Sequence, residues 1–356
     1  MNLDDIQAVT AQSGESAIAT LRSVPDQYRE SFEAALSLDF PEPYRFANEV
    51  LVCGMGGSRW PALIIESVFR DRLRLPLLLN ANPVLPGWVD DRTLVVLSSY
   101  SGTTDEPIAN GRELLERKHT LLTGVAHGAG IADILRTAGV PHYLFDAKYN
   151  PSGQPRNGYG YTLGALLGIL VKLGIIDADP GAIRASFDRL GDVIARFDLD
   201  RSSNDNLAKR LAAKLHDRYP YLLTGHFLEG VGNAFQNQIN ETAKAISSYR
   251  VIPEINHHLM EGLAHPQWHH DGALFLFCSS PLYHPDHAKR FAITREVIEK
   301  QGIASEWIDT EGETPFDHAL YLLLLGNWTA LYLSALYGEN PNAIPYVDYF
   351  KQRMRE

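Results

Sequence analysis

The chain has 356 residues, of which 45% are hydrophobic, with a formal net charge of −11 and two cysteines. It is long enough for two cores, which excludes a small disulfide scaffold, and its acidic balance without a Lys/Arg stripe argues against a nucleic-acid partner. We expect no leader peptide, no membrane-spanning run and free buried thiols at Cys53 and Cys278, and therefore a cytoplasmic protein.

Residues 1–45 are predicted to form a polar helical lead-in with an apolar side that includes Ala17, Ile18 and Leu21. Strands and helices then alternate, with helices such as Trp60–Arg70 and Glu106–Lys118. The expected strands are Val50–Cys53, Leu75–Leu79, Leu94–Ser98, Thr120–Gly124 and His142–Phe145. This order predicts a doubly wound, parallel α/β sheet of the flavodoxin-like kind.

A turn-rich segment at residues 150–158 marks the expected boundary, and the apolar helix Tyr161–Leu173 follows it. A second alternation has expected strands at Tyr219–Thr224, Ser248–Ile252, Leu274–Cys278 and Glu306–Asp309. Its expected helices are Leu228–Ile246, Asp286–Gln301, Pro315–Tyr337 and a short C-terminal helix over Ile344–Met354. We therefore divide the chain into a lead-in (1–45), a first α/β domain (46–155) and a second (156–356).

Two of the strands in the first half end in segments rich in Gly, Ser and Thr. GMGGS occupies residues 54–58, and SYSGTT, which begins at Ser99, occupies residues 99–104. The backbone N–H groups and hydroxyls of such turns bind anions; the candidates are Gly56, Gly57, Ser58, Ser99, Ser101 and Thr104. Either turn alone is best explained as a tight connection, but the pair on neighbouring strands favours phosphate. Neither turn carries the GK[ST] or the third glycine of a nucleotide-binding loop.

Three further residues are candidates for chemistry. Glu241 lies on a predicted helix whose small residues permit close packing against a partner. A half-buried carboxylate there would have a raised pKa, as a general base requires. Spacing alone favours a simpler exposed pair with Lys244. Arg156, in the turn-rich junction, is placed to stabilise an oxyanion, although an exposed arginine is the simpler interpretation. Lys351 near the C terminus has the same two interpretations.

Histidines gather after the predicted strand that ends at Ile252. Of the adjacent His257 and His258, at most one is expected to act as a proton shuttle. A zinc site would draw on His257, His258, His265, His269 and His270, but their spacing matches no common zinc pattern. No metal is expected.

Taken together, these segments resemble the bifunctional phosphoglucose/phosphomannose isomerases, which are built from two sugar-isomerase (SIS) domains. The motifs that carry the resemblance occur in the family's order: GMGGS at 54–58, SYSGTT at 99–104, Gln154-Pro155-Arg156, NETAK at 240–244, PEINH at 253–257 and a C-terminal lysine. The resemblance spans nearly the whole chain.

The resemblance implies an aldose–ketose isomerase that needs no cofactor and works on a sugar phosphate held by the serine turns. Glu241 would move the proton between C2 and C1 through a cis-enediol, while Arg156 stabilises the enediolate. His257 would open the sugar ring from the neighbouring subunit with help from Lys351. A homodimer with shared active sites, acting in glycolysis or gluconeogenesis, is therefore expected.

Three positions depart from the family's pattern and leave the sugar preference open. Arg59 replaces a small residue after GMGGS, Thr103 changes the usual SGNT to SGTT, and His258 replaces an asparagine. One alternative is a SIS protein that binds sugar phosphates without turnover, which would lack the acid/base residues. Another is an amide-transferring hexosamine enzyme, which would need an N-terminal glutaminase.

Overall fold

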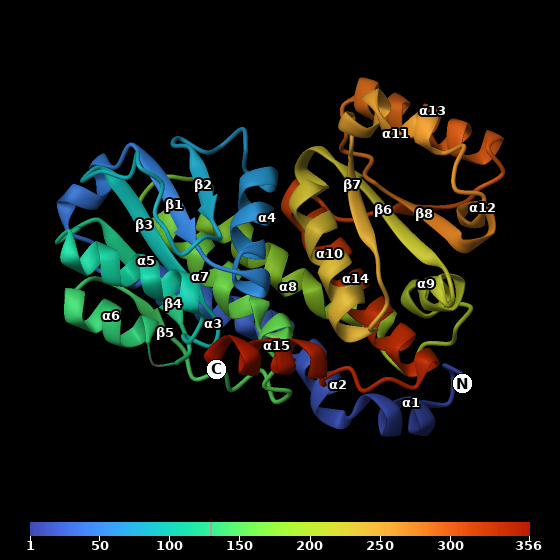
Figure 1. Cartoon of the computed structure of the whole chain (residues 1–356), viewed down its shortest axis with the longest axis horizontal. Helices are drawn as coiled ribbons and strands as arrows, with labels where there is room; N and C mark the ends of the chain where they lie inside the picture. The colour runs from blue at the N-terminus through green and yellow to red at the C-terminus, as the bar shows by residue number, and fades with distance from the viewer. Residues whose placement is uncertain (129) are drawn as a thin grey trace.

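A computed structural model of the chain describes residues 1–128 and 130–356. Figure 1 shows two α/β units side by side, with α4 (Trp60–Val68), α10 (Glu229–Thr242) and α14 (Pro315–Tyr337) between their sheets. The first sheet has the order β2-β1-β3-β4-β5 and the second the order β7-β6-β8-β9, and the paired strands are parallel. The predicted fold class is confirmed.

The strands of the first sheet are β1 (Glu49–Cys53), β2 (Leu77–Asn80), β3 (Thr93–Ser99), β4 (Leu122–Ala126) and β5 (Tyr143–Leu144). Those of the second are β6 (Tyr219–Gly225), β7 (Ser248–Ile252), β8 (Ala273–Ser279) and β9 (Ala304–Asp309). All nine predicted strands are present, with ends displaced by at most two residues. The central strands β3 and β8 are buried at every position, as in sheets covered by helices on both faces.

The predicted helices are also present as α4, α10 and α14 and as α5 (Asp105–Glu116), α7 (Tyr159–Lys172), α13 (Pro285–Lys300) and α15 (Pro345–Arg355). Five others were not predicted: α6 (Ile131–Ala138), α8 (Pro180–Phe197), α9 (Leu207–Leu215), α11 (Leu259–Gly262) and α12 (Trp268–Gly272). Asp179 and Asn206 cap α8 and α9 through their side chains, so capping signals in the sequence would have located both.

Residues 1–45 are helical, as expected, but they do not form a peripheral lead-in. They contain α1 (Ile6–Ser13), α2 (Glu15–Arg22) and α3 (Val24–Leu36), and α3 packs along α7. Glycines on α7 allow this contact: a Cβ at Gly164 would lie 2.8 Å from the carbonyl oxygen of Tyr28, and one at Gly168 would lie 2.9 Å from that of Phe32. The division between the two domains at residues 155 and 156 stays a prediction. α7 follows this boundary in the sequence but packs against α3, which precedes it.

The expectation that no apolar run reaches membrane-spanning length is wrong for α14. This helix is long and apolar enough by composition, with a mean hydropathy of 1.5, yet 94% of its most apolar window is buried inside the fold. It packs against α8, α9 and α10, so neighbouring helices cover its apolar surface. α14 is therefore the core helix of the second unit.

The small residues of α10 have the packing role that the sequence predicts. A Cβ at Gly230 would lie 2.3 Å from the carbonyl oxygen of Leu63 on α4. Gly230→Ala should therefore push α10 away from α4 and lower the free energy of unfolding by about 1–3 kcal/mol. Denaturant titration measures this loss.

The matched control is Gly191→Ala on the exposed side of α8, where a Cβ would meet no atom within 4 Å. That change should instead stabilise the helix by roughly 0.5–1 kcal/mol. Equal stability of the Gly230→Ala variant and the unmodified protein would contradict the close packing of α10 on α4.

Candidate active site

The two polar turns lie together at the carboxyl edge of the first sheet. β1 and β3 are neighbours where the strand order reverses, which is the point where doubly wound sheets bind ligands. The Ser98 hydroxyl donates to the carbonyl oxygen of Ser58 at 2.9 Å, and the Tyr100 N–H donates to Ser58 Oγ at 2.8 Å. The predicted meeting of the turns is thus confirmed. Gly56, with φ of 49°, takes the left-handed conformation that favours glycine.

Within the second turn the hydroxyls differ in exposure. Ser99 is fully buried; its Oγ accepts from the Gly102 N–H at 3.0 Å and lies 3.0 Å from Thr104 Oγ1. The Thr103 hydroxyl donates to Ser101 Oγ at 3.1 Å. Ser99 therefore holds the shape of the turn, whereas Ser101 and Thr104 are half-buried at its surface.

A tyrosine that was not predicted links this turn to the junction that carries Arg156. The Tyr100 ring packs on Gly158 so closely that a Cβ there would lie 2.0 Å from Cε2 of the ring. Its hydroxyl lies 2.6 Å from Nδ2 of Asn150. A Cβ at Gly57, in the first turn, would lie 3.6 Å from the Cα of Arg156. Both turns therefore lie against the junction.

Arg156, at the junction between the two units, and Glu241, in the second unit, face each other. Arg156, in the short helix η3 (Pro155–Asn157), is 3% exposed, so the simpler interpretation of an exposed arginine is wrong. Its Nη1 lies 3.8 Å from Oε2 of Glu241 at the end of α10. The guanidinium also donates to the side-chain oxygen of Gln154 at 3.2 Å and to the carbonyl oxygen of Pro341.

Burial raises the pKa of the Glu241 carboxyl, and the positive charges of Arg156, Lys244 and Lys351 partly oppose that rise. The expected side-chain pair between Glu241 and Lys244 is not formed. Lys244 Nζ donates to the main-chain carbonyl of Glu241 at 2.9 Å, and the carboxylate faces Arg156. The Glu241 side chain remains 37% exposed, so a ligand can reach it.

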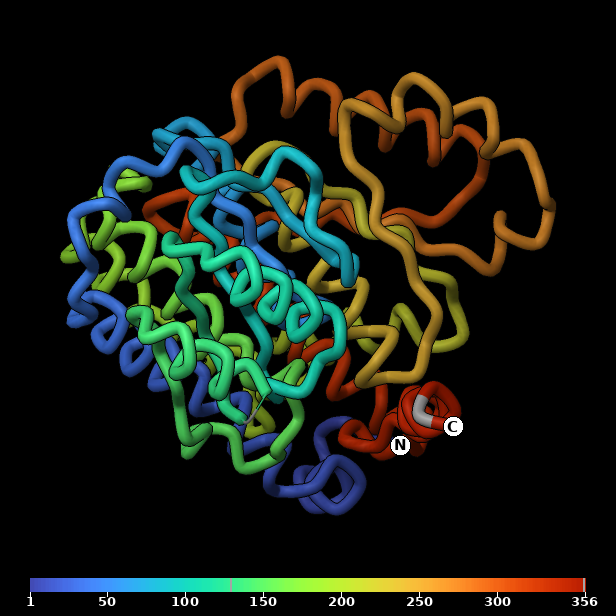
Figure 2. Tube along the Cα trace, turned by 60° about the vertical axis from the view of Figure 1, so that its left-hand side comes forward, coloured from blue at the N-terminus to red at the C-terminus, as the bar shows by residue number. Residues whose placement is uncertain are grey.

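Glu241 borders a cavity of about 680 Å³ that the end of α10 forms with the segment leading into α15. Its lining comprises Asn240, Glu241, Lys244, Glu339 and residues 343–347. Lys351 is exposed on α15, close enough for its charge to act on the Glu241 carboxyl. Figures 1 and 2 both place α15 along the lower side of the molecule. The structure thus brings Lys351 toward Glu241.

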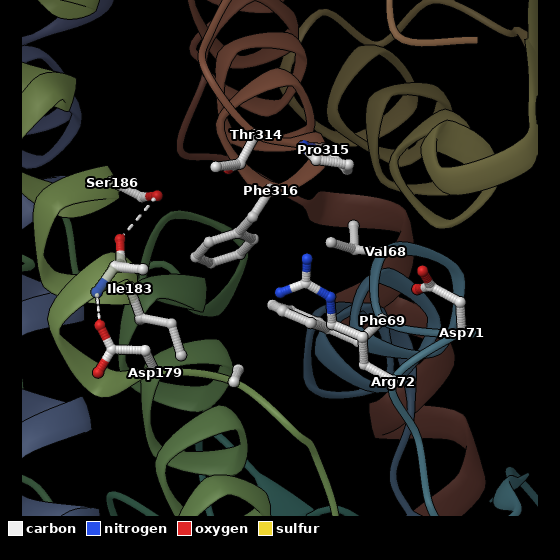
Figure 3. A pocket seen from close by; sticks show the side chains of 12 residues that line it. Val68, Phe69, Asp71, Arg72, Asp179, Ile183, Ser186, Thr314, Pro315 and Phe316 are labelled. Carbon is white, nitrogen blue, oxygen red and sulfur yellow. Dashed lines mark hydrogen bonds between the residues drawn. The ribbon is translucent and has the colours of Figure 1, made fainter. Parts of the chain in front are cut away.

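A second cavity lies between the end of α4 and the N-termini of α8 and α14. Figure 3 shows the side chains of Arg72 and Phe316 at this cavity. None of the predicted site residues lines it.

His257 is not brought to Glu241 within the chain. Ser247 N donates to Asn240 Oδ1 at 2.9 Å, so β7 starts beside the end of α10 that carries Glu241. From there β7 runs away from Glu241, toward α11 in Figure 1, and His257 is exposed in the short helix η5 (Glu254–His257) that follows. If His257 serves the Glu241 site, it must do so in another copy of the chain.

The remaining histidines of this region do not form a ligand set. His269 Nδ1 bonds to the carbonyl of Pro266, and His270 Nε2 lies 3.2 Å from the carbonyl oxygen of Leu263. In residues 1–128 and 130–356, no three His, Cys, Asp or Glu side chains are grouped as a metal would require.

Comparisons with known proteins agree with this architecture. Residues 204–354 match the bacterial phospho-glucose isomerase C-terminal SIS domain. The bifunctional phosphoglucose/phosphomannose isomerase of Caldicellulosiruptor bescii is 28% identical, with 94% of this chain and 97% of that protein covered. Its namesake from Aquifex aeolicus is 24% identical, with coverage of 86% and 90%.

A solved structure shares the fold. The tagatose-6-phosphate ketose/aldose isomerase of Escherichia coli superposes with a TM-score of 0.71 at 15% identity, covering 92% of this chain and 95% of that one. The comparisons lead to one assignment: residues 204–354 match the C-terminal SIS domain of the bacterial phospho-glucose isomerases, and nearly the whole chain is similar to the bifunctional phosphoglucose/phosphomannose isomerases.

Proposed function

We propose that the protein is an aldose–ketose isomerase that interconverts glucose 6-phosphate with fructose 6-phosphate and also accepts mannose 6-phosphate. The observation that carries this proposal is the accessible Glu241 carboxylate beside the buried guanidinium of Arg156, next to two phosphate-type turns. Both aldoses give the same enediol once the C2 proton is removed, so one base serves both if the C1–C2 bond turns in the site.

In the proposed reaction, Glu241 takes the proton from C2 of the open-chain aldose and returns it to C1. Its raised pKa brings the base closer to neutral pH, where proton transfer is efficient in both directions. Arg156 stabilises the negative charge that develops on the enediolate oxygen. The phosphate is held by the N–H groups of Gly56 and Gly57 and by the hydroxyls of Ser58, Ser101 and Thr104, while Ser99 supports their turn.

Ring opening is assigned to His257 of a neighbouring subunit, with Lys351 assisting. The exposure of His257 and its separation from Glu241 in one chain support this assignment. The active species is then a homodimer in which each site draws on both subunits. A cytoplasmic role in glycolysis or gluconeogenesis follows from the proposed substrates.

The decisive experiment supplies purified protein with glucose 6-phosphate and separately with mannose 6-phosphate, in EDTA and without added metal, and measures fructose 6-phosphate. Formation of product from either sugar supports the isomerase. Binding of both sugars without product would instead support the SIS-domain sugar-phosphate sensor.

The pH dependence of kcat/KM should report the ionisation of Glu241. The base acts only as a carboxylate, so activity falls as the pH drops through its pKa. Because burial raises that pKa, the acid limb should lie above the usual range of a glutamate. Arg156→Leu removes a charge that lowers the pKa of Glu241, so the limb of the residual activity should move to still higher pH. A limb that stays in place, or moves down, would exclude Glu241 as the titrating base.

A further inference from the structure

Lys244 makes contacts that the proposed reaction does not use. It lies two residues beyond the end of α10 with a φ of 56°, a left-handed conformation that residues with a Cβ rarely adopt. In this position Nζ donates to the carbonyl oxygens of Glu241 at 2.9 Å and Thr242 at 3.2 Å. A lysine at a helix C-terminus commonly makes such bonds, and they alone would indicate only a cap.

A third bond extends beyond the helix. Lys244 Nζ also donates to the carbonyl oxygen of Pro341 at 3.4 Å, and Arg156 donates to the same oxygen from the junction between the two units. Pro341 belongs to the segment between α14 and α15, and residues 343–347 of its continuation line the Glu241 cavity. One carbonyl thus joins α10, the Arg156 junction and the segment that leads to Lys351.

This arrangement places two cations on one acceptor. Burial and the charge of Arg156 lower the pKa of Lys244 to about 8, while Glu339 and Glu241 oppose that shift. The Glu241 carboxylate, 3.8 Å from Arg156, and the Glu339 carboxylate offset part of the repulsion between the two cations. Moving the Pro341 segment would therefore disturb the Arg156–Glu241 pair and the start of α15 together.

We propose that Lys244 is a positioning residue which, through the Pro341 carbonyl that it shares with Arg156, holds the 339–343 segment and the start of α15 against the active site. This inference rests on the proposed function for its kinetic part only. The phosphate turns lie in the other unit, so Lys244 should affect turnover and leave substrate binding nearly unchanged.

The test compares Lys244→Met, Lys244→Arg and the control Lys300→Met. Lys300 also ends a helix, but its ion pair is with Glu296 on the same helix. Hydrogen exchange of the unliganded protein, followed by mass spectrometry, should become roughly ten-fold faster in peptides covering 339–350 for Lys244→Met. kcat should fall about ten-fold with KM changed less than two-fold. Lys244→Arg should recover most of both, and Lys300→Met should match the unmodified protein.

The two readouts separate this inference from the proposed function. An unmodified protein without isomerase activity overturns the proposed function, whereas the exchange measurement still tests the contact. Unchanged exchange in 339–350 for Lys244→Met overturns the inference, even if kcat falls. Faster exchange with unchanged kcat overturns the positioning role in turnover.

Discussion

Glu241→Gln should lose most of the turnover while it retains sugar-phosphate binding. The amide has nearly the shape of the carboxylate and still faces Arg156, but it cannot accept the C2 proton. General base catalysis is typically worth about 10²–10⁴-fold, so kcat should fall by a factor in that range. Binding should persist because the phosphate turns lie on the other unit, at the ends of β1 and β3.

Steady-state kinetics and calorimetric titration with glucose 6-phosphate measure the two quantities. Glu229→Gln provides a matched control, because Glu229 lies in the first turn of the same helix and pairs with the exposed Arg70. That variant should keep kcat within about two-fold, since an exposed pair contributes little. Near-normal kcat in Glu241→Gln would show that Glu241 is structural and that another residue is the base.

Mixing two inactive variants should restore activity if the sites are shared between subunits. Glu241→Gln lacks the base, and His257→Ala lacks the proposed ring-opening group. In a two-fold symmetric dimer each contact occurs twice, so a mixed dimer collects both lesions in one site and leaves the other intact. Activity should approach one working site for each mixed dimer.

Native mass spectrometry of the mixture confirms that the subunits have exchanged, and each variant alone supplies the baseline. Activity that stays at baseline after confirmed exchange would mean that His257 acts within its own chain or not at all. Because His257 is exposed and follows β7 away from Glu241, the first of these would require a large movement of η5.

The sheets were predictable because buried parallel strands form continuous apolar runs that end in polar turns. Their ends were harder to place: in residues 120–126, Thr and Gly are interspersed with apolar residues, and the strand predicted over Thr120–Gly124 is displaced by two residues from β4 at Leu122–Ala126. The serine turns could be predicted because each directly follows such an apolar run. A turn at the carboxyl end of a buried parallel strand lies at the edge of the sheet where ligands bind.

The pairing of Glu241 was not predictable from spacing. Helical spacing favours Lys244 as its partner, but α10 ends at Thr242 and Lys244 turns back with positive φ onto main-chain carbonyls. The partner that the carboxylate faces, Arg156, is remote in sequence and meets it only after both units have folded. Likewise, no local pattern marks the Pro341 carbonyl as part of the site, and the position of Tyr100 within SYSGTT does not reveal its contact with Gly158.

The glycines of α7 have a consequence for the first forty residues. They let the backbones of α3 and α7 approach more closely than side chains would allow, and Arg156 stands immediately before α7. Gln27 of α3 also donates to the carbonyl oxygen of Asn157 at 3.1 Å, so η3, which carries Arg156, is supported by a helix that contains none of the residues assigned to the sugar phosphate. Without α3, the surface of α7 that it covers would be open to water and η3 would lose one of its supports. The N-terminal helices thus support the junction that carries Arg156, which faces the base Glu241.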